Sequence, residues 1–112
     1  MLDPTTGTFY SVFMRVISRK ALIKFYSVKG NADAKGPCEA WFSEAKKADW
    51  TKPQDIKDRY ATASFLGDER VVFNIGGNKY RLVVVVLYDA KQVLIRFIGT
   101  HANYDRINAE KV

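Results

Sequence analysis

Four side chains in the C-terminal third of the sequence have the chemistry of a site that handles phosphate. Arg81 and Arg96 each interrupt an apolar, β-rich run, and His101 and Tyr104 come directly after the second run. A guanidinium presents a planar fork of N–H donors to a phosphate, and an imidazole exchanges protons near neutral pH. A tyrosine can stack on a base or donate a hydrogen bond. Together these residue types suit the binding and cleavage of a phosphodiester.

This chemistry suits RNA, because RNA carries its own nucleophile. The 2′-hydroxyl attacks the neighbouring phosphate when one group removes its proton, another protonates the leaving 5′-oxygen, and cations stabilise the phosphorane. The single histidine and single cysteine cannot form the usual metal-binding clusters, and Gly76-Gly77-Asn78 lacks the spacing of a phosphate-binding loop. We therefore expect metal-free acid–base chemistry without a cofactor.

Each candidate also has a structural explanation. A lone histidine is more often a packed or surface residue than a catalyst, and an arginine within a strand can be an ion-pair partner. A tyrosine such as Tyr104 often packs a helix on a sheet. Lys79, beside a turn, is either a solvated charge or a general phosphate contact. Cys38 has no histidine nearby and is a poor candidate for a nucleophile.

The element that would position these residues is a β-hairpin. Residues 79–88 and 92–98 are two β-rich runs separated by Asp89-Ala90-Lys91, which has the length and polarity of a hairpin connection. Both alternating faces of the first run are mostly apolar, so we expect a central strand covered on both sides. A two-residue loop would place Arg81 and Arg96 on one face, and a three-residue loop would place them on opposite faces. The sequence leaves both registers open.

The rest of the chain changes from a helical period to a strand period. Apolar stripes and end signals predict three helices, and alternation with turn signals predicts short strands and a final short helix. Helices followed by an antiparallel sheet indicate the α+β class. The expected helices cover residues 19–26, 36–48, a third segment after an N-cap at Thr51, and 102–106, and the further strands cover 15–17, 63–66 and 70–75.

The bulk composition is that of one small globular domain. The chain has 112 residues, of which 47% are hydrophobic and 27% charged, with a formal net charge of +6. Such a basic surface favours a polyanionic partner. With one cysteine no internal disulfide can form, which fits a reducing cytoplasm, and no run of residues is apolar enough to suggest a membrane partner.

The N-terminal residues differ in composition from the rest of the chain. Residues 1–13 contain no basic residue, whereas Met14-Arg15-Val16-Ile17 reads like a natural start followed by a strand. We therefore expect residues 1–13 to be an N-terminal extension and residues 14–112 to be the functional domain.

Five sequence blocks, which occur in the same order as in a known family, carry a resemblance. Through these blocks the chain resembles the HigB-type toxins of bacterial toxin–antitoxin systems, a branch of the RelE-like superfamily. The blocks are Met14-Arg15-Val16-Ile17-Ser18, Lys46-Lys47-Ala48-Asp49-Trp50, Arg70-Val71-Val72-Phe73-Asn74-Ile75, Gly77-Asn78-Lys79-Tyr80-Arg81-Leu82-Val83, and Ile95-Arg96-Phe97-Ile98-Gly99-Thr100-His101-Ala102-Asn103-Tyr104-Asp105.

The resemblance implies an mRNA interferase that cuts translated messages in the ribosomal A site and is held inactive by a HigA-like helix-turn-helix antitoxin. It also implies a compact RelE-like domain in which N-terminal helices pack on a small antiparallel sheet, with a short C-terminal helix. Arg81 matches the superfamily's arginine in Tyr-Arg-Leu-Val, and His101 matches the basic residue just after the last strand. RelE-like relatives carry lysines in the strand where this chain has Val72 and Asn74, so we expect either that His101 carries more of the proton transfer or that Lys79 or Lys57 substitutes for the lysines.

The expected site is built on these matches. We expect His101, Arg81 and Tyr104 to be catalytic, and we expect RNA contacts from Arg96, Lys79, Lys57 and Asn74. The alternative function is inhibition of a protein target such as DNA gyrase by a toxin of the same fold. A non-catalytic RNA-binding module is less favoured, because the sequence shows no pair of exposed aromatic residues on adjacent strands.

Overall fold

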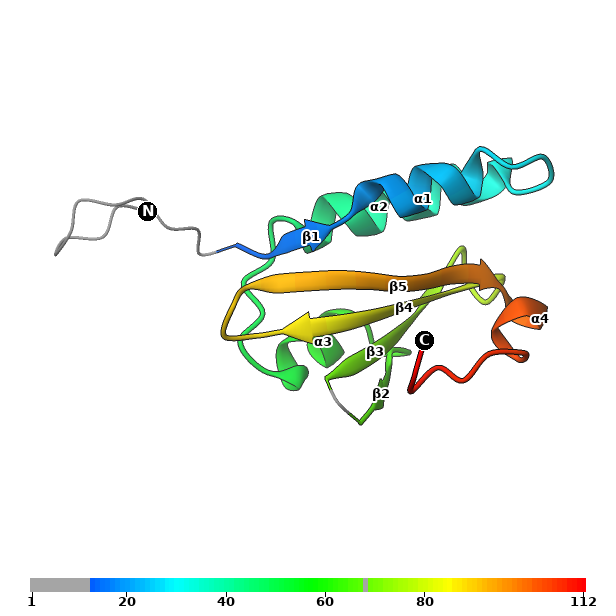
Figure 1. Ribbon diagram of the computed structural model, residues 1–112. Coiled ribbons are helices and arrows are strands. Elements are labelled where there is room, and N and C mark those ends of the chain that lie inside the picture. The colour runs from blue at the N-terminus through cyan, green and yellow to red at the C-terminus, as the bar shows by residue number, and fades with distance from the viewer. Residues whose placement is uncertain (1–12, 68) are drawn as a thin grey trace, which may run out of the picture.

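A computed structural model describes residues 13–67 and 69–112. Five strands form one sheet in the order β1-β5-β4-β3-β2, and helices α1, α2 and α3 cover one of its faces (Figure 1). The elements are β1 (Arg15–Ile17), α1 (Arg19–Tyr26), a 3-10 turn η1 (Ala32–Ala34), α2 (Lys35–Ala45), α3 (Pro53–Arg59), β2 (Ser64–Leu66), β3 (Arg70–Ile75), β4 (Tyr80–Leu87), β5 (Gln92–Thr100) and α4 (His101–Tyr104).

The α+β class predicted from the sequence is confirmed, with one correction to the sheet. Strands β2 to β5 pair antiparallel, but β1 pairs with β5 in parallel, with Val16 opposite Val93. A fully antiparallel sheet was therefore the wrong expectation. The chain leaves β1 directly into α1 and returns to β5 only after the other strands, and a long connection of this kind is what a parallel pair requires.

The hydrophobic core lies between the sheet and the three helices. Alternate residues of β4 (Tyr80, Leu82, Val84 and Val86) point into it, where they are at most 1% exposed. Phe73 of β3 packs edge-on against Trp41 of α2, with ring centroids 5.4 Å apart. Burying a side chain of this size contributes about 1.5–3 kcal/mol, so this layer supplies most of the stabilisation that holds the sheet.

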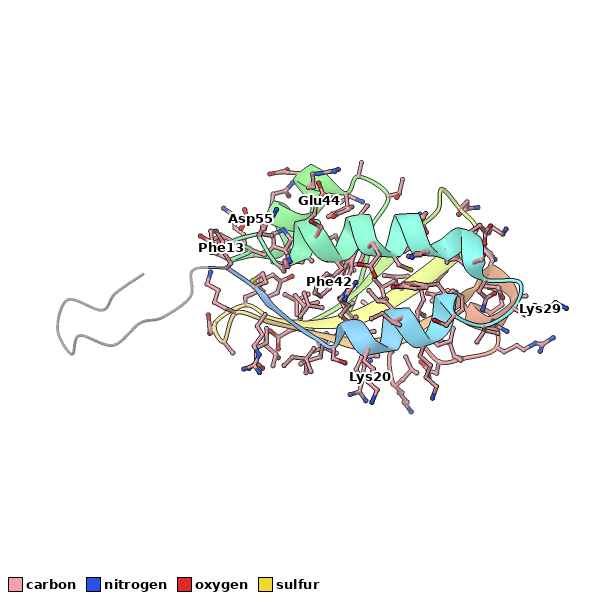
Figure 2. The ribbon with its side chains drawn as sticks, turned by 90° about the horizontal axis from the view of Figure 1, so that it is seen from above. Phe13, Lys20, Lys29, Phe42, Glu44 and Asp55 are labelled. Atoms are coloured by element: carbon pink, nitrogen blue, oxygen red, sulfur yellow. The ribbon has the colours of Figure 1, made fainter. Side chains whose placement is uncertain are left out.

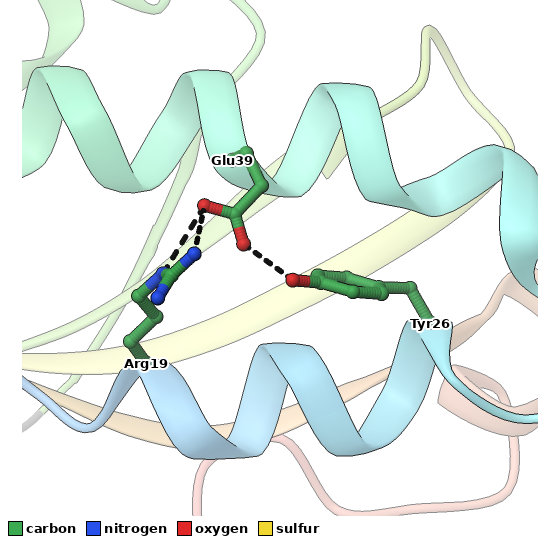
Figure 3. A network of polar contacts seen from close by, with 3 residues as sticks. All are labelled: Arg19, Tyr26 and Glu39. Atoms are coloured by element: carbon green, nitrogen blue, oxygen red, sulfur yellow. Dashed lines mark hydrogen bonds and ion pairs between the residues drawn. The ribbon is translucent and has the colours of Figure 1, made fainter.

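Helices α1 and α2 lie side by side over the sheet (Figure 2). One carboxylate joins them: Glu39 of α2 accepts hydrogen bonds from the Arg19 guanidinium at 2.9 and 3.1 Å and from the Tyr26 hydroxyl at 2.6 Å (Figure 3). Lys20 and Lys29 are exposed on the outside of this layer (Figure 2). The layer therefore uses its acidic groups internally and presents basic groups to solvent.

The opposite face of the sheet carries Arg70, Val72, Asn74, Arg81 and Val83, and we call it the C-terminal face because residues 105–112 cross it (Figure 1). Val83 is fully buried although it points away from the helices. Both faces of β4 are thus covered, as its apolar pattern predicts. Helices cover one face, and the C-terminal segment crosses the other.

The β4–β5 hairpin has a register that neither loop prediction gave. Leu87 pairs with Gln92 across a four-residue connection, and a β-bulge between Val83 and Val84 leaves Arg96 as an extra residue in β5. Beyond the bulge Arg81 pairs with Gly99, and the Arg96 side chain bonds to the C-terminal segment. Arg81 and Arg96 therefore share the C-terminal face, the outcome expected of the two-residue loop, but through a bulge.

The other element boundaries are close to the predicted ones. Gly76 and Gly77 adopt φ values of 64° and 68°, so the positive-φ turn predicted there is confirmed. Helix α2 ends at Ala45 rather than at residue 48, and α4 spans residues 101–104 rather than 102–106. The N-cap of α3 is Lys52 rather than Thr51. The Thr51 side chain instead donates to the Asp55 carboxylate at 2.9 Å.

The boundary proposed near Met14 falls at the start of the described residues. Met14 is 3% exposed, belongs to the core, and donates its N–H to the Ala48 carbonyl at 2.9 Å. Of the predicted extension 1–13, all residues except Phe13 lie outside the described part of the chain. Within the described ranges, no helix combines the length and apolarity needed to cross a bilayer.

Candidate active site

The candidate site lies where the start of β4 and the end of β5 meet α4. Asn74 of β3 pairs directly with Arg81 of β4, and Arg81 pairs with Gly99 of β5. Paired residues on neighbouring strands point to the same face, so these three positions form a row across the C-terminal face. The Arg81 guanidinium donates from Nη1 to the Asn78 carbonyl at 3.3 Å, which directs it toward the β3–β4 turn. A half-buried cation thus lies at the centre of the row.

His101 is placed by the cap of α4. Asn103 donates its N–H to Thr100 Oγ1 at 3.1 Å, and Thr100 donates its N–H to Asn103 Oδ1 at 3.3 Å, which forms a reciprocal capping box. The His101 N–H donates to the Lys79 carbonyl at 3.2 Å and so fixes the residue beside the β3–β4 turn. The cap and the bond to Lys79 hold the backbone of His101 at a defined position, two residues after the Gly99 that pairs with Arg81.

The His101 ring contacts a carboxylate and is partly exposed to solvent. Its Nδ1 lies 3.5 Å from Asp105 Oδ2, and half of the side chain is exposed. Such a carboxylate can orient an imidazole ring. The exposed part of the ring can meet a substrate directly, so the geometry is compatible with proton transfer.

An aromatic pair lies beside these groups. The Phe97 and Tyr104 ring centroids are 6.5 Å apart with the planes tilted by 51°. Phe97 extends over Gly99, where an added Cβ would come within 2.5 Å of the Phe97 ring carbon Cζ. Glycine at position 99 is therefore required for the ring to lie there. The pair provides an apolar surface next to Arg81 on which a base could stack.

Arg96 and a second arginine meet further along the same face. Arg96 Nε donates to the main-chain oxygen of Val112 at 3.2 Å, and Arg70 Nη1 donates to the same oxygen. Sequence reasoning missed Arg70, which it treated only as the first residue of a strand. The signal was present, because Arg70 lies four residues before Asn74 and strand alternation places both on one face.

The two candidate lysines are held elsewhere. The Lys79 ammonium pairs with Asp33, whose carboxylate also accepts from the Tyr80 hydroxyl, and these two hydrogen bonds lower the pKa of Asp33. Lys57 of α3 donates to the Ala63 carbonyl at 2.9 Å. The structure pairs Asn74 with Arg81 and places His101 and Tyr104 on α4, which contacts β4 and β5. Arg96 lies on the same face as Arg81, and the two ammonium groups are bound to other partners.

Cysteine chemistry and metal binding find little support in the described residues. Cys38 is buried in α2, and burial raises the pKa of its thiol to about 11, so the thiolate needed of a nucleophile is scarce near neutral pH. Within residues 13–67 and 69–112, no three His, Cys, Asp or Glu side chains gather in a way that could hold a metal ion.

Comparison with known proteins places the chain in a family. A family model described as HigB_toxin, RelE-like toxic component of a toxin-antitoxin system, matches residues 34–107, which is more than half of the chain. The chain belongs to the HigB toxin family. The matched residues run from the end of η1 through α4 and contain the candidate residues Asn74, Arg81, Arg96, His101 and Tyr104.

Individual HigB relatives are similar over a shorter stretch. The chain is 32% identical over 65 residues to the mRNA interferase toxin HigB of Escherichia coli strain K12, and equally to the mRNA interferase HigB of Shigella flexneri. Each alignment covers 56% of this chain and 62% of the relative. The chain therefore spans less than two thirds of the length of these curated relatives.

Proposed function

We propose that this HigB family member is an endoribonuclease that cleaves translated mRNA on the ribosome. The observation that carries the proposal is that Arg81, His101 and Tyr104 lie at the same end of the β4–β5 hairpin and the helix that follows it. Arg81 is a cation, His101 is a proton-transfer group and Tyr104 is an aromatic ring. The similarity to proteins named mRNA interferases supports the same activity.

In the proposed reaction the RNA 2′-hydroxyl attacks the adjacent phosphorus. A 2′-O–P bond forms and the P–O5′ bond breaks, which leaves a 2′,3′-cyclic phosphate and a 5′-hydroxyl. His101 exchanges a proton with one of the two reacting oxygens, and Arg81 stabilises the negative charge that develops on the phosphorane. Tyr104, beside Phe97, holds a neighbouring base by stacking or donates a hydrogen bond.

Other residues bind the RNA strand without taking part in the chemistry. Asn74, directly opposite Arg81, can donate a hydrogen bond to the substrate, and Arg96 can bind a phosphate further along the face. Lys79 and Lys57 would join these contacts only by leaving Asp33 and the Ala63 carbonyl. The net charge of +6 favours a polyanionic surface such as the ribosome.

The proposed partners are those that the family implies. As a toxic component of a toxin–antitoxin system, the chain would be held inactive by a HigA-like helix-turn-helix antitoxin, and its substrate would be mRNA in the bacterial cytoplasm. An antitoxin that covers the C-terminal face would block the site directly. One that covers the basic outer surface of α1 would instead prevent docking to the ribosome.

Induction in a host without the antitoxin tests the proposal. We would express the full chain and its His101→Ala variant and map the ends of an abundant message by primer extension. The proposal predicts growth arrest with codon-phased cuts in the wild type and no cuts in the variant. Growth arrest with intact messages would contradict it and would move the function to a protein target such as DNA gyrase.

A further inference from the structure

Two arginines from strands that are not neighbours converge on one main-chain oxygen. Arg70 belongs to β3 and Arg96 to the bulge of β5, with β4 between them, and both donate to the Val112 oxygen. Within the described ranges neither guanidinium contacts an Asp or Glu side chain. Two cations therefore lie close together and share a single main-chain oxygen.

In this arrangement several N–H donors of Arg70 and Arg96 make no hydrogen bond with the described residues. Arg70 Nε is buried and has no hydrogen-bond partner among the described residues. A guanidinium has five N–H donors, and a buried donor without a partner lowers stability. Arg96 bonds through Nε while its side chain remains exposed, so its terminal nitrogens are accessible. The pair could bind a group with more acceptor oxygens than Val112 offers.

We propose that Arg70 and Arg96 form a phosphate-binding site on the C-terminal face, and that residues 106–112 occupy this site through Val112 until a phosphate of the RNA backbone displaces them. The inference rests on the proposed function for the identity of the polyanion. It adds a second contact point remote from the reacting group and a segment of the chain that competes with substrate for it.

The competition favours phosphate on chemical grounds. A phosphate carries a negative charge and several acceptor oxygens, and the planar fork of each arginine can bind two of them, whereas both arginines now share the single Val112 oxygen. The other hydrogen bonds of residues 105–112 are local turns, such as Ile107 N–H to the Tyr104 carbonyl and Val112 N–H to the Asn108 carbonyl. These turns can persist when the segment leaves the sheet.

The site is placed to bind the strand that enters the active site. Arg96 lies three positions before Gly99 in β5, about 10 Å at ~3.3 Å per residue, and Gly99 faces Arg81. Phe97, the next residue after Arg96, covers the surface between them. An RNA strand held at Arg81 can therefore continue along the C-terminal face to the arginine pair.

The test monitors the Val112 methyl groups by NMR in the full chain. The probe is a single-stranded RNA oligonucleotide with 2′-O-methyl groups, which the chain cannot cleave. We expect the Val112 resonances to move to those of an exposed segment with the same midpoint as oligonucleotide binding measured by fluorescence anisotropy. Unchanged Val112 resonances at saturation, or no binding of the oligonucleotide, would overturn the inference.

Substitutions identify the groups that bind. Arg70→Gln and Arg96→Gln should each weaken binding about tenfold, the effect of one charge-assisted hydrogen bond, and should move the Val112 resonances even without RNA. Arg96 is exposed in a bulge, so its variant keeps the sheet intact. The matched control is Arg59→Gln, which removes the same charge from α3 on the helix side. Equal binding by all three variants would contradict the proposal.

This experiment separates the inference from the proposed function. It needs neither cleavage nor ribosomes, so a chain that exchanges its C-terminal segment for the oligonucleotide but cuts no message would support the phosphate site and count only against the ribonuclease activity. Cleavage of messages by a chain whose Val112 resonances do not respond to the oligonucleotide would support the ribonuclease activity and contradict the phosphate site.

Discussion

The two faces of the sheet treat their charged groups in opposite ways. On the helix side, three carboxylates each hold one basic side chain and one tyrosine: Glu39 with Arg19 and Tyr26, Glu44 with Arg59 and Tyr60, and Asp33 with Lys79 and Tyr80. On the C-terminal face, the hydrogen bonds of three arginines go to main-chain oxygens, from Arg81 to Asn78 and from Arg70 and Arg96 to Val112.

We propose that the difference separates the groups that hold the fold from the groups that bind substrate. The carboxylate groups join elements that are distant in sequence, such as α1 with α2 and η1 with β4, so they fix the fold. The arginines of the C-terminal face have no acidic side chain to neutralise them in the described residues, and a cation in that state attracts an external anion. Substitutions on the two faces should therefore affect different measurements.

The largest expected effect is on cleavage by Arg81→Ala. Removal of the guanidinium should slow cleavage of a ribosome-bound message by about 100-fold or more, because the charge on the phosphorane loses its stabilising cation. The melting temperature should change little, because Arg81 bonds only to the Asn78 carbonyl within the described residues. Arg59→Ala on the helix side is the control, and it should lower the melting temperature without slowing cleavage.

A smaller effect is expected from Gly99→Ala. The new methyl group would meet the Phe97 ring at 2.5 Å and Asn103 Cβ at 3.1 Å. The ring tip can swing aside, so the free energy of unfolding should fall by only about 1 kcal/mol. Cleavage should fall about tenfold, because the aromatic surface beside Arg81 and the cap that positions His101 both shift. Single-turnover kinetics would measure this, and an unchanged rate would remove the Phe97–Tyr104 pair from the site.

On the helix side, Glu44→Gln should affect stability alone. Glu44 accepts from the Tyr60 hydroxyl at 2.5 Å and from Arg59, and the amide keeps only part of these bonds. We expect the free energy of unfolding to fall by about 1 kcal/mol in urea titrations, with the rate of RNA cleavage unchanged. Slower cleavage at equal folded population would show that the two faces are not independent.

The smallest effect per residue is expected on the pH dependence of the free energy of unfolding. Hydrogen bonds from Tyr26 and Arg19 lower the pKa of Glu39, those from Tyr60 and Arg59 lower that of Glu44, and those from Lys79 and Tyr80 lower that of Asp33. A carboxyl whose pKa is lower in the folded state stabilises the fold above its unfolded pKa of about 4, and this stabilisation is lost as the pH falls further. Urea titrations at pH 7 and pH 3 should therefore differ, and Glu39→Gln should reduce the difference.

Much of the fold could be predicted because local patterns determine it. The alternation in residues 70–75 and the paired glycines at 76 and 77 specify a strand and a positive-φ turn within a few residues, and both are found as expected. The two apolar faces of β4 indicated its central place in the sheet. The residue types at Arg81, His101 and Tyr104 predict a site by their chemistry, and that site stays a prediction.

What could not be predicted depends on interactions between distant segments. The bulge beside Val84 changes the register by one residue, and alternation alone does not reveal such an insertion. The parallel pairing of β1 depends on how the helices return the chain, and the pairing of Lys79 with Asp33 joins residues from different layers. The path of residues 105–112 over Arg70 likewise has no local signal, so the contact of Arg70 with Val112 could not be predicted.

The most direct test of the account concerns the nucleophile. Purified chain would be added to ribosomes that hold either an ordinary message or one with a 2′-deoxy nucleotide at the mapped cleavage position. The account predicts that the ordinary message is cut to leave a 2′,3′-cyclic phosphate, and that the 2′-deoxy message stays intact at that position. Cleavage of the 2′-deoxy message at the same site would show that the RNA does not supply the nucleophile and would contradict the mechanism assigned to the C-terminal face.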